Sequence, residues 1–210
     1  MTRQGWYPRY GKRALDLVGA SVGILGLLPI AVCVALLIRL SLGSPVLFRH
    51  RRPGLDGVPF MLVKFRTMAD RHGADGRPLP DGERITRTGR LLRAASLDEI
   101  PELWNVLRGE MSLVGPRPLL MQYLPLYSPA QARRHEVRPG ITGLAQVTGR
   151  NGLGWEKRFE LDVYYVDHHS LGLDIRILWR TVLAVLSCRD ITQPGRATVD
   201  CFQGNEACNG

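Results

Sequence analysis

The sequence has few cysteines, and no two of them stand at C-x-x-C spacing. Its four cysteines occupy positions 33, 188, 201 and 208 of the 210 residues. Cys33 lies in an apolar run, where a thiol behaves as a small hydrophobic group. A disulfide between Cys201 and Cys208 is not expected if this region faces the cytosol. The cysteines therefore predict neither a structural zinc site nor a disulfide framework.

Lysine is also scarce, although the chain is strongly basic. Lys12, Lys64 and Lys157 are the only lysines among 28 basic residues, and the formal net charge is +9. Such a charge indicates an anionic partner, for which nucleic acid, anionic lipid headgroups and phosphorylated substrates all qualify. A recognisable nucleic-acid-binding motif is missing, and this class would leave the long uncharged run near the N-terminus unexplained. We therefore expect no nucleic-acid partner.

Charged residues are absent from Leu17 to Ile38. As a helix this run is roughly 33 Å long, enough to cross the hydrocarbon core of a bilayer. An A-x-A cleavage site does not follow it, and the run is long for the apolar region of a signal peptide. We predict a membrane helix within residues 12–42, with a buried core helix as the alternative.

Pro29 near the middle of this run predicts a bend or break, because proline removes a backbone donor and clashes with the preceding turn. Basic residues flank the run on both sides, so a spanning helix would place one basic cluster outside, against the positive-inside bias. A re-entrant helix that turns at Pro29 keeps both clusters on the cytoplasmic face. We favour the re-entrant helix, and a kinked spanning helix remains open.

A second domain or an internal repeat is not evident, so residues 1–210 are expected to form a single domain of mainly helical α+β class. Residues 45–48 and 58–65, separated by the turn-forming segment 53–57, predict a β-hairpin. Helical patterns occur at 88–94, 155–166 and 171–186. The last of these suits either the headgroup surface, as an interface-lying amphipathic helix, or a core. Residues 43–192 would form the part outside the membrane, and residues 193–210 a flexible tail.

Two adjacent carboxylates, Asp98 and Glu99, follow Ser96, and Arg117 stands between two prolines about twenty residues later. A carboxylate can attack phosphorus or hold a divalent metal, and a guanidinium can bind phosphate oxygens bidentately. The pattern indicates phosphate chemistry. Ser96 to Glu99 also fits the S-x-x-E capping box that begins many ordinary helices. Both interpretations are compatible, because a helix N-terminus favours a bound phosphate.

Three further basic residues are candidate phosphate or nucleotide ligands. Lys64, together with Arg66, alternates with apolar residues on a predicted strand, where a solvated strand face is the alternative. Arg138 and Arg150 border a segment rich in glycine. Its glycines allow a close backbone approach to a ligand, and a turn-rich connector is the alternative.

Taken together, these stretches resemble the bacterial sugar transferase family of polyprenyl-phosphate phosphoglycosyl transferases, and in particular its small monotopic members. The resemblance covers nearly the whole chain. It rests on the apolar N-terminus with its central proline and on six motifs: R-P-G-L-D at 52–56, K-F-R-T-M at 64–68, S-L-D-E at 96–99, N-V-L-R-G-E-M-S-L-V-G-P-R-P at 105–118, R-P-G-I-T-G at 138–143 and F-E-L-D-V-Y-Y-V at 159–166.

The resemblance implies a re-entrant membrane helix with its break at Pro29 and an active site on the cytoplasmic face of the bacterial inner membrane, in contact with membrane lipids. It implies Mg²⁺-dependent transfer of a sugar-1-phosphate from a UDP-sugar to undecaprenyl phosphate with release of UMP. By the motif match, Asp98 would be the nucleophile, and Glu99 its partner in metal coordination or proton handling. A catalytically silent membrane scaffold of the same fold is the alternative. The resemblance leaves room for a homo-oligomer and favours an N-acetylated donor sugar.

Overall fold

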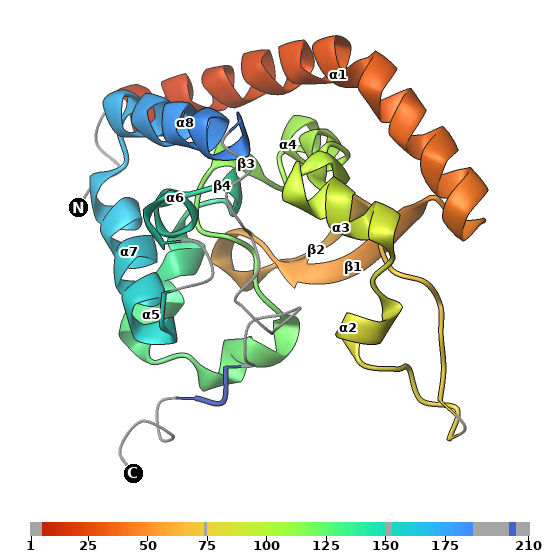
Figure 1. The fold of residues 1–210 in the computed structure, drawn as a ribbon. Helices are drawn as coiled ribbons and strands as arrows, with labels where there is room; N and C mark the ends of the chain where they lie inside the picture. Colours follow the sequence, from red (N-terminus) through yellow and green to blue (C-terminus); the bar gives the residue numbers. More distant parts are fainter. Residues whose placement is uncertain (1–5, 74, 150–152, 187–201, 205–210) are drawn as a thin grey trace.

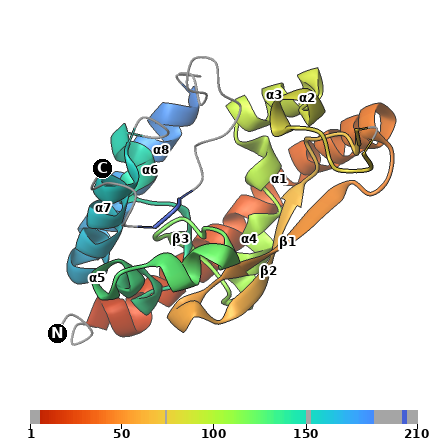
Figure 2. The same cartoon turned by 90° about the horizontal axis from the view of Figure 1, so that it is seen from below.

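The computed structural model describes residues 6–73, 75–149, 153–186 and 202–204. The long helix α1 (Lys12–Leu42) arches over the other elements. Beneath one part of it lie the hairpin of β1 (Leu47–Pro53) and β2 (Pro59–Phe65) and the helices α2 (Asp81–Arg84), α3 (Arg87–Ala94) and α4 (Glu102–Arg108). Beneath the other lie α5 (Pro129–Ala132), α6 (Leu144–Gly149), α7 (Trp155–His168) and α8 (Leu171–Leu186). The chain is mainly helical, as predicted, and Figures 1 and 2 show these two groups side by side.

α1 exposes apolar side chains along most of its length. It is the one described helix that is long and apolar enough to cross a membrane, and only 11% of its most apolar window is buried within the protein. A core helix would bury most of such a window, so the structure favours the predicted membrane helix. The helix continues through Pro29 as a single element of 31 residues. The re-entrant path through a bilayer stays a prediction.

The predicted hairpin is confirmed, and its first strand is longer than expected. β1 pairs with β2 antiparallel, from Leu47 opposite Phe65 to Pro53 opposite Pro59. Arg52 lies opposite Phe60, so by alternation it shares a face of the hairpin with Lys64. The other edge of β2 is capped by the Asn105 side chain, which accepts a hydrogen bond from the Val63 amide and donates one to the Met61 carbonyl. α4 is thereby fixed against the hairpin.

The glycine-rich segment brings two parts of the chain together. β3 (Ser112–Val114) and β4 (Gly140–Thr142) form a short parallel pair. A Cβ atom on Gly140 would stand 2.1 Å from the Gly115 nitrogen, a distance that no side chain tolerates. The close backbone approach predicted for a ligand is, at this glycine, an approach to the chain itself. This pairing fixes the backbone immediately before Pro116 and Arg117.

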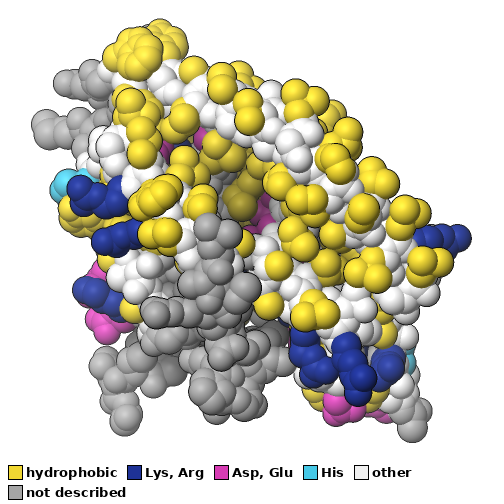
Figure 3. All heavy atoms as spheres, turned by 45° about the horizontal axis from the view of Figure 1, so that its top comes forward, with side chains coloured by type: hydrophobic (Ala, Val, Ile, Leu, Met, Phe, Trp, Pro, Cys, Tyr) yellow, Lys and Arg dark blue, Asp and Glu magenta, His cyan; other side chains and the backbone are white. Residues whose placement is uncertain are grey.

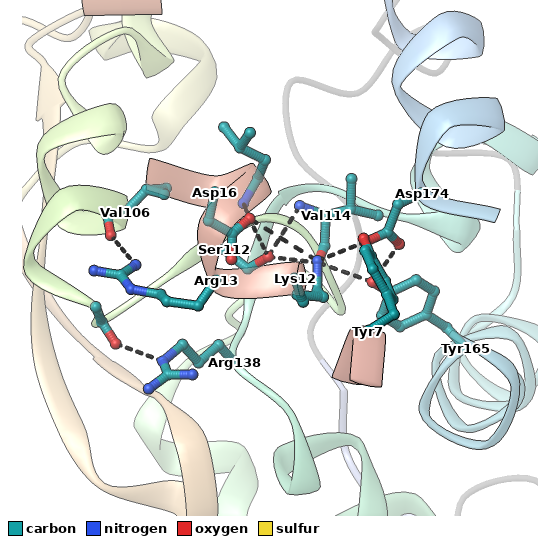
Figure 4. Close-up of polar contacts among 12 residues, drawn as sticks. Tyr7, Lys12, Arg13, Asp16, Val106, Ser112, Val114, Arg138, Tyr165 and Asp174 are labelled. Atoms are coloured by element: carbon teal, nitrogen blue, oxygen red, sulfur yellow. Dashed lines mark hydrogen bonds and ion pairs between the residues drawn. The ribbon is translucent and has the colours of Figure 1, made fainter. Parts of the chain in front are cut away.

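A buried polar cluster ties the N-terminal end of α1 to α8 (Figure 4). The Asp174 carboxylate is fully buried and accepts hydrogen bonds from Tyr7, Lys12 and Tyr165 at 2.5, 2.8 and 2.7 Å. One turn along α1, Asp16 accepts from the Ser112 hydroxyl at 2.9 Å. Buried carboxylates are stable only when they are paired in this way. The cluster holds the start of the membrane helix in a fixed position on the catalytic part.

Of the predicted flexible tail, the structure describes residues 202–204, and Phe202 among them is packed against other side chains. Phe202 is buried in an aromatic cluster with Tyr123, Tyr127, Trp155 and Phe159. Its ring lies 5.1 Å from that of Phe159 in an edge-to-face arrangement, a geometry that aromatic pairs favour. At this position the chain returns to the core beside α7.

Candidate active site

The backbone around the two carboxylates is irregular, and the predicted capping box is wrong. Ser96 has φ 55° and ψ 20°, a left-handed conformation that is uncommon for a residue other than glycine. Its side chain caps nothing. It ends α3 and turns the chain into a single 3₁₀ turn, Leu97–Glu99, and α4 begins only after Pro101. The turn places Asp98 and Glu99 between two helices.

Basic side chains from two other segments converge on Glu99. The Lys64 ammonium lies 2.9 Å from Glu99 Oε1, and the Arg117 guanidinium lies 2.5 Å from the same oxygen. Lys64 comes from β2, on the face of the hairpin that turns toward the carboxylates. The structure thus brings together four of the predicted site residues: Lys64, Asp98, Glu99 and Arg117.

Asp98 differs sharply from its neighbour. It is 8% exposed, and within the described residues its carboxylate receives no hydrogen bond. Burial, followed by the adjacent charge of Glu99, raises the pKa of Asp98, and Lys64, Arg93 and Arg117 counter this only in part. Burial would raise the pKa of Glu99 as well, but Arg117 and Lys64 outweigh it and hold that pKa below its usual range. Glu99 is therefore a fixed anion, and Asp98 is a poorly solvated carboxylate free to react.

Glu102 is a third carboxylate of the site, and our reading of the sequence missed it. It is 2% exposed and lies 2.8 Å from the Lys64 ammonium. Burial raises its pKa to about 7, because the attraction of Lys64 does not fully offset desolvation and the repulsion of Glu99. The available signal was its position on the first turn after Pro101, three residues beyond Glu99. The charges of Lys64 and Arg117 act on all three carboxylates, so their protonation states are coupled.

The raised pKa of Glu102 predicts a pH-dependent stability. Between its ordinary pKa and about 7, the folded protein binds a proton at Glu102 that the unfolded chain has released. The contribution of Glu102 to the free energy of unfolding should therefore decrease as the pH rises through that range. In Glu102→Gln this decrease should be lost, as measured by melting temperature against pH in detergent with EDTA. Parallel profiles of melting temperature against pH for the wild type and the mutant would contradict the assignment. The control is Glu156→Gln, which changes an exposed carboxylate at the start of α7.

Two further arginines near the site form hydrogen bonds within the chain. Arg93, whose charge acts on Asp98, donates to the buried Thr67 hydroxyl at 3.0 Å. Arg66, which we considered as a partner of Lys64 in a phosphate site, donates to the carbonyls of Leu42, Pro45 and Met68 instead. It anchors the chain that follows α1.

Arg138 has a partner within the chain. Its guanidinium donates to the Gly109 carbonyl at 2.8 Å, while Arg13 donates to the carbonyls of Val106 and Leu107. The last carbonyls of a helix lack partners within it, so both arginines complete the C-terminal end of α4 (Figure 4). Phosphate binding by Arg138 stays a prediction, and the structure adds a structural role for its Nε atom. Arg150 lies outside the described residues.

The donor set fits a magnesium ion. Mg²⁺ is bound through one or two carboxylates together with substrate phosphates and water. Asp98 offers an unpaired carboxylate, and Glu99 offers the oxygen that Lys64 and Arg117 leave free. Among the described residues no group of three His, Cys, Asp or Glu side chains forms a metal cage. The arrangement suits an ion that arrives with a phosphorylated substrate.

Comparison with known proteins shows the family of the chain. The family model described as bacterial sugar transferase matches residues 7–188. The chain is 54% identical over 194 residues to a Bacillus subtilis (strain 168) protein named uncharacterized sugar transferase EpsL, covering 92% of this chain and 96% of that one. It is 46% identical over 187 residues to a Caulobacter vibrioides protein named UDP-glucose:undecaprenyl-phosphate glucose-1-phosphate transferase, covering 84% and 70%.

It is 38% identical over 195 residues to a Rhizobium meliloti protein named exopolysaccharide production protein ExoY, covering 85% and 86%. The matched region includes the membrane helix, the hairpin and every described residue of the carboxylate site. This protein is therefore a transferase enzyme that belongs to the bacterial sugar transferase family.

Proposed function

We propose that the protein transfers a sugar-1-phosphate from a UDP-sugar to undecaprenyl phosphate, giving undecaprenyl-diphosphate-sugar and UMP. The observation that carries the proposal is the unpaired, buried carboxylate of Asp98 beside a Glu99 held by Lys64 and Arg117. The names of the relatives support the same substrate classes. Such a reaction would be the first membrane step in assembling a glycan.

In the first step an oxygen of Asp98 attacks the β-phosphorus of the UDP-sugar. The bond from that phosphorus to the bridging oxygen breaks, and UMP leaves with the electron pair. The product is a covalent acyl phosphate that carries the sugar. In the second step an oxygen of undecaprenyl phosphate attacks the same phosphorus and releases the Asp98 carboxylate. Two displacements through one covalent intermediate give ping-pong kinetics.

Each basic residue has a role in this sequence. Arg117 neutralises the oxygens of the phosphate under attack, and its present partner Glu99 shows that the guanidinium is aimed at anions in the site. Lys64 holds Glu99 and Glu102 in place. Mg²⁺, held by Asp98 and Glu99, would neutralise diphosphate oxygens and stabilise the leaving UMP.

We also propose that the site works at the surface of the inner membrane, on its cytoplasmic face. Exposed hydrophobic side chains run along α1 and the outer face of α8, where Ile175, Trp179 and Leu183 are about half exposed or more. Figure 3 shows hydrophobic side chains gathered on this face, with Lys and Arg at its margins, as expected for a headgroup interface. If α1 is re-entrant, tags at both chain ends should be labelled only from the cytoplasm. A periplasmic N-terminus would reject it.

A panel of UDP-sugars tests the function directly. Purified protein in detergent with Mg²⁺ and undecaprenyl phosphate should release UMP from at least one donor. Both UDP-glucose, the donor named for a relative, and UDP-N-acetylated sugars belong in the panel. The alternative, a catalytically silent membrane scaffold, predicts no release from any donor.

A further inference from the structure

A second arginine, whose charge interacts with that of Arg117, forms no ion pair with a described carboxylate. Arg52 comes from the end of β1, on the face of the hairpin that also carries Lys64. Its Nε atom is buried and has no hydrogen-bond partner among the described residues. A buried donor without a partner is costly, and this cost is often met by a ligand.

The charges around Arg52 also favour a bound anion. Burial and then the neighbouring charge of Arg117 lower the pKa of Arg52, and Glu102 offsets this only in part. Two guanidinium groups that repel one another are stabilised together by an anion placed between them. A diphosphate, with charge on both phosphoryl groups, meets this requirement better than a single carboxylate.

Arg158 is a third guanidinium whose charge is felt at Arg117. It lies over the Trp155 ring at 4.6 Å and is half-buried. Burial lowers its pKa, the Asp162 carboxylate opposes this, and the charges of Arg134 and Arg117 lower the pKa further. Stacking on an aromatic ring holds a guanidinium while leaving its edge N–H groups free to donate. Arg158 therefore offers a further donor to an anion bound near Arg117.

The surroundings of Arg52 indicate which substrate it meets. β1 contacts the 3₁₀ segment Met121–Leu126, and the tyrosines Tyr123 and Tyr127 lie near the Arg52 charge. Adjacent Pro53 packs close to Arg117, Arg134 and His135, with no space between them for a water molecule. None of these elements belongs to the exposed apolar surface of α1 and α8. A phosphate bound here thus belongs to a water-soluble substrate, not to a lipid.

We propose that Arg52 binds the phosphate that the leaving nucleotide retains, while Arg117 faces the phosphate that Asp98 attacks, with Arg158 as a further donor. This assignment rests on the proposed function, since it divides the diphosphate of a UDP-sugar between two arginines. It makes Arg52 a binding residue for the donor and for the UMP product, with no contact to undecaprenyl phosphate.

Substitution of Arg52 tests the assignment. Arg52→Met should raise KM for the UDP-sugar and weaken UMP binding by about 10- to 100-fold, the usual range for a charged hydrogen bond. KM for undecaprenyl phosphate should stay unchanged. Arg52→Lys keeps the charge but loses the planar fork, so its effect should be intermediate. Arg51→Met is the matched control, because it removes the same charge from the opposite face of the same strand.

UMP binding measured by titration calorimetry separates this proposal from the function itself. If wild-type protein releases no UMP from any donor, the proposed function fails, while weaker UMP binding in the Arg52 variants would still support the phosphate site. If wild-type protein is active and Arg52→Met leaves both KM and UMP binding unchanged, the assignment is overturned. A rise confined to KM for undecaprenyl phosphate would also overturn it, because Arg52 would then serve the lipid. Should Arg52→Met fail to fold, Arg52→Lys decides by the same criteria.

Discussion

Asp98→Asn should lower UMP release by about 10³-fold or more, as expected when a nucleophile is removed from a catalytic group that acts as a unit. The amide has nearly the shape of the carboxylate but cannot form the acyl phosphate. Folding should be preserved, because within the described residues the Asp98 side chain accepts no hydrogen bond that the change would break. Burial and Glu99 raise the pKa of Asp98, so its charge opposes folding at neutral pH, and the melting temperature should be equal or slightly higher.

The measurement combines a UMP-release assay with thermal melting in the same detergent. Asp70→Asn is the matched control, since this carboxylate is 80% exposed in the loop before α2 and should leave turnover unchanged. Incubation with donor alone should add one phosphosugar to residue 98 of the wild-type protein, as detected by mass spectrometry. Normal turnover in Asp98→Asn would reject Asp98 as the nucleophile.

Arg134→Met should lower the free energy of unfolding by about 3–5 kcal/mol, the usual cost of leaving one buried charge without its partner. Arg134 and Asp162 are 1% and 2% exposed, and two guanidinium nitrogens lie 2.7 and 3.1 Å from the same carboxylate oxygen. Burial raises the pKa of Asp162, and Arg134 provides the main opposing attraction. Arg134 also donates to the Arg117 carbonyl at 2.9 Å, so catalysis should fall along with stability.

The neighbouring pair provides a matched control. Arg133 pairs with Asp167 at the surface, where an ion pair contributes about 1 kcal/mol or less, so Arg133→Met should have a small effect on stability. Removing both buried charges, in Arg134→Met with Asp162→Leu, should recover much of the lost stability without restoring the hydrogen bond to Arg117. Stability would be measured by thermal or chemical denaturation. Equal destabilisation by the Arg133 and Arg134 substitutions would contradict the greater contribution of the buried ion pair.

The elements with long, regular patterns could be predicted from the sequence. The uncharged run gave the membrane helix, and the turn residues at 53–57 placed the hairpin, because each signal is local. A site containing Lys64, Glu99 and Arg117 was also predicted. Without the family resemblance, however, residues 96–99 could equally be interpreted as an ordinary helix cap. Local signals were sufficient wherever the partners of a residue lie nearby in the chain.

The failures have a common cause, which is that a side chain's role depends on distant backbone. Nothing in the residues around Arg138 shows that the Gly109 carbonyl lies within reach. Glu102 becomes part of the site only because β2 brings Lys64 against it. Ser96 matches a capping box in sequence, yet the need to turn between α3 and the 3₁₀ segment imposes a left-handed backbone that rules the cap out. Arg52 was likewise not recognised as a site residue, because in the sequence it is one of several arginines that follow the apolar run.

The bonds from Tyr7 and Lys12 to Asp174 span 167 and 162 residues of sequence. A ribosome therefore delivers the first partners long before the last, and α1 can reach the lipid while its anchor has yet to be synthesised. A nascent chain would thus hold its apolar helix without a fixed orientation until α8 emerges. Emergence of α8 from the ribosome would then be the event that fixes the start of α1 against the rest of the protein.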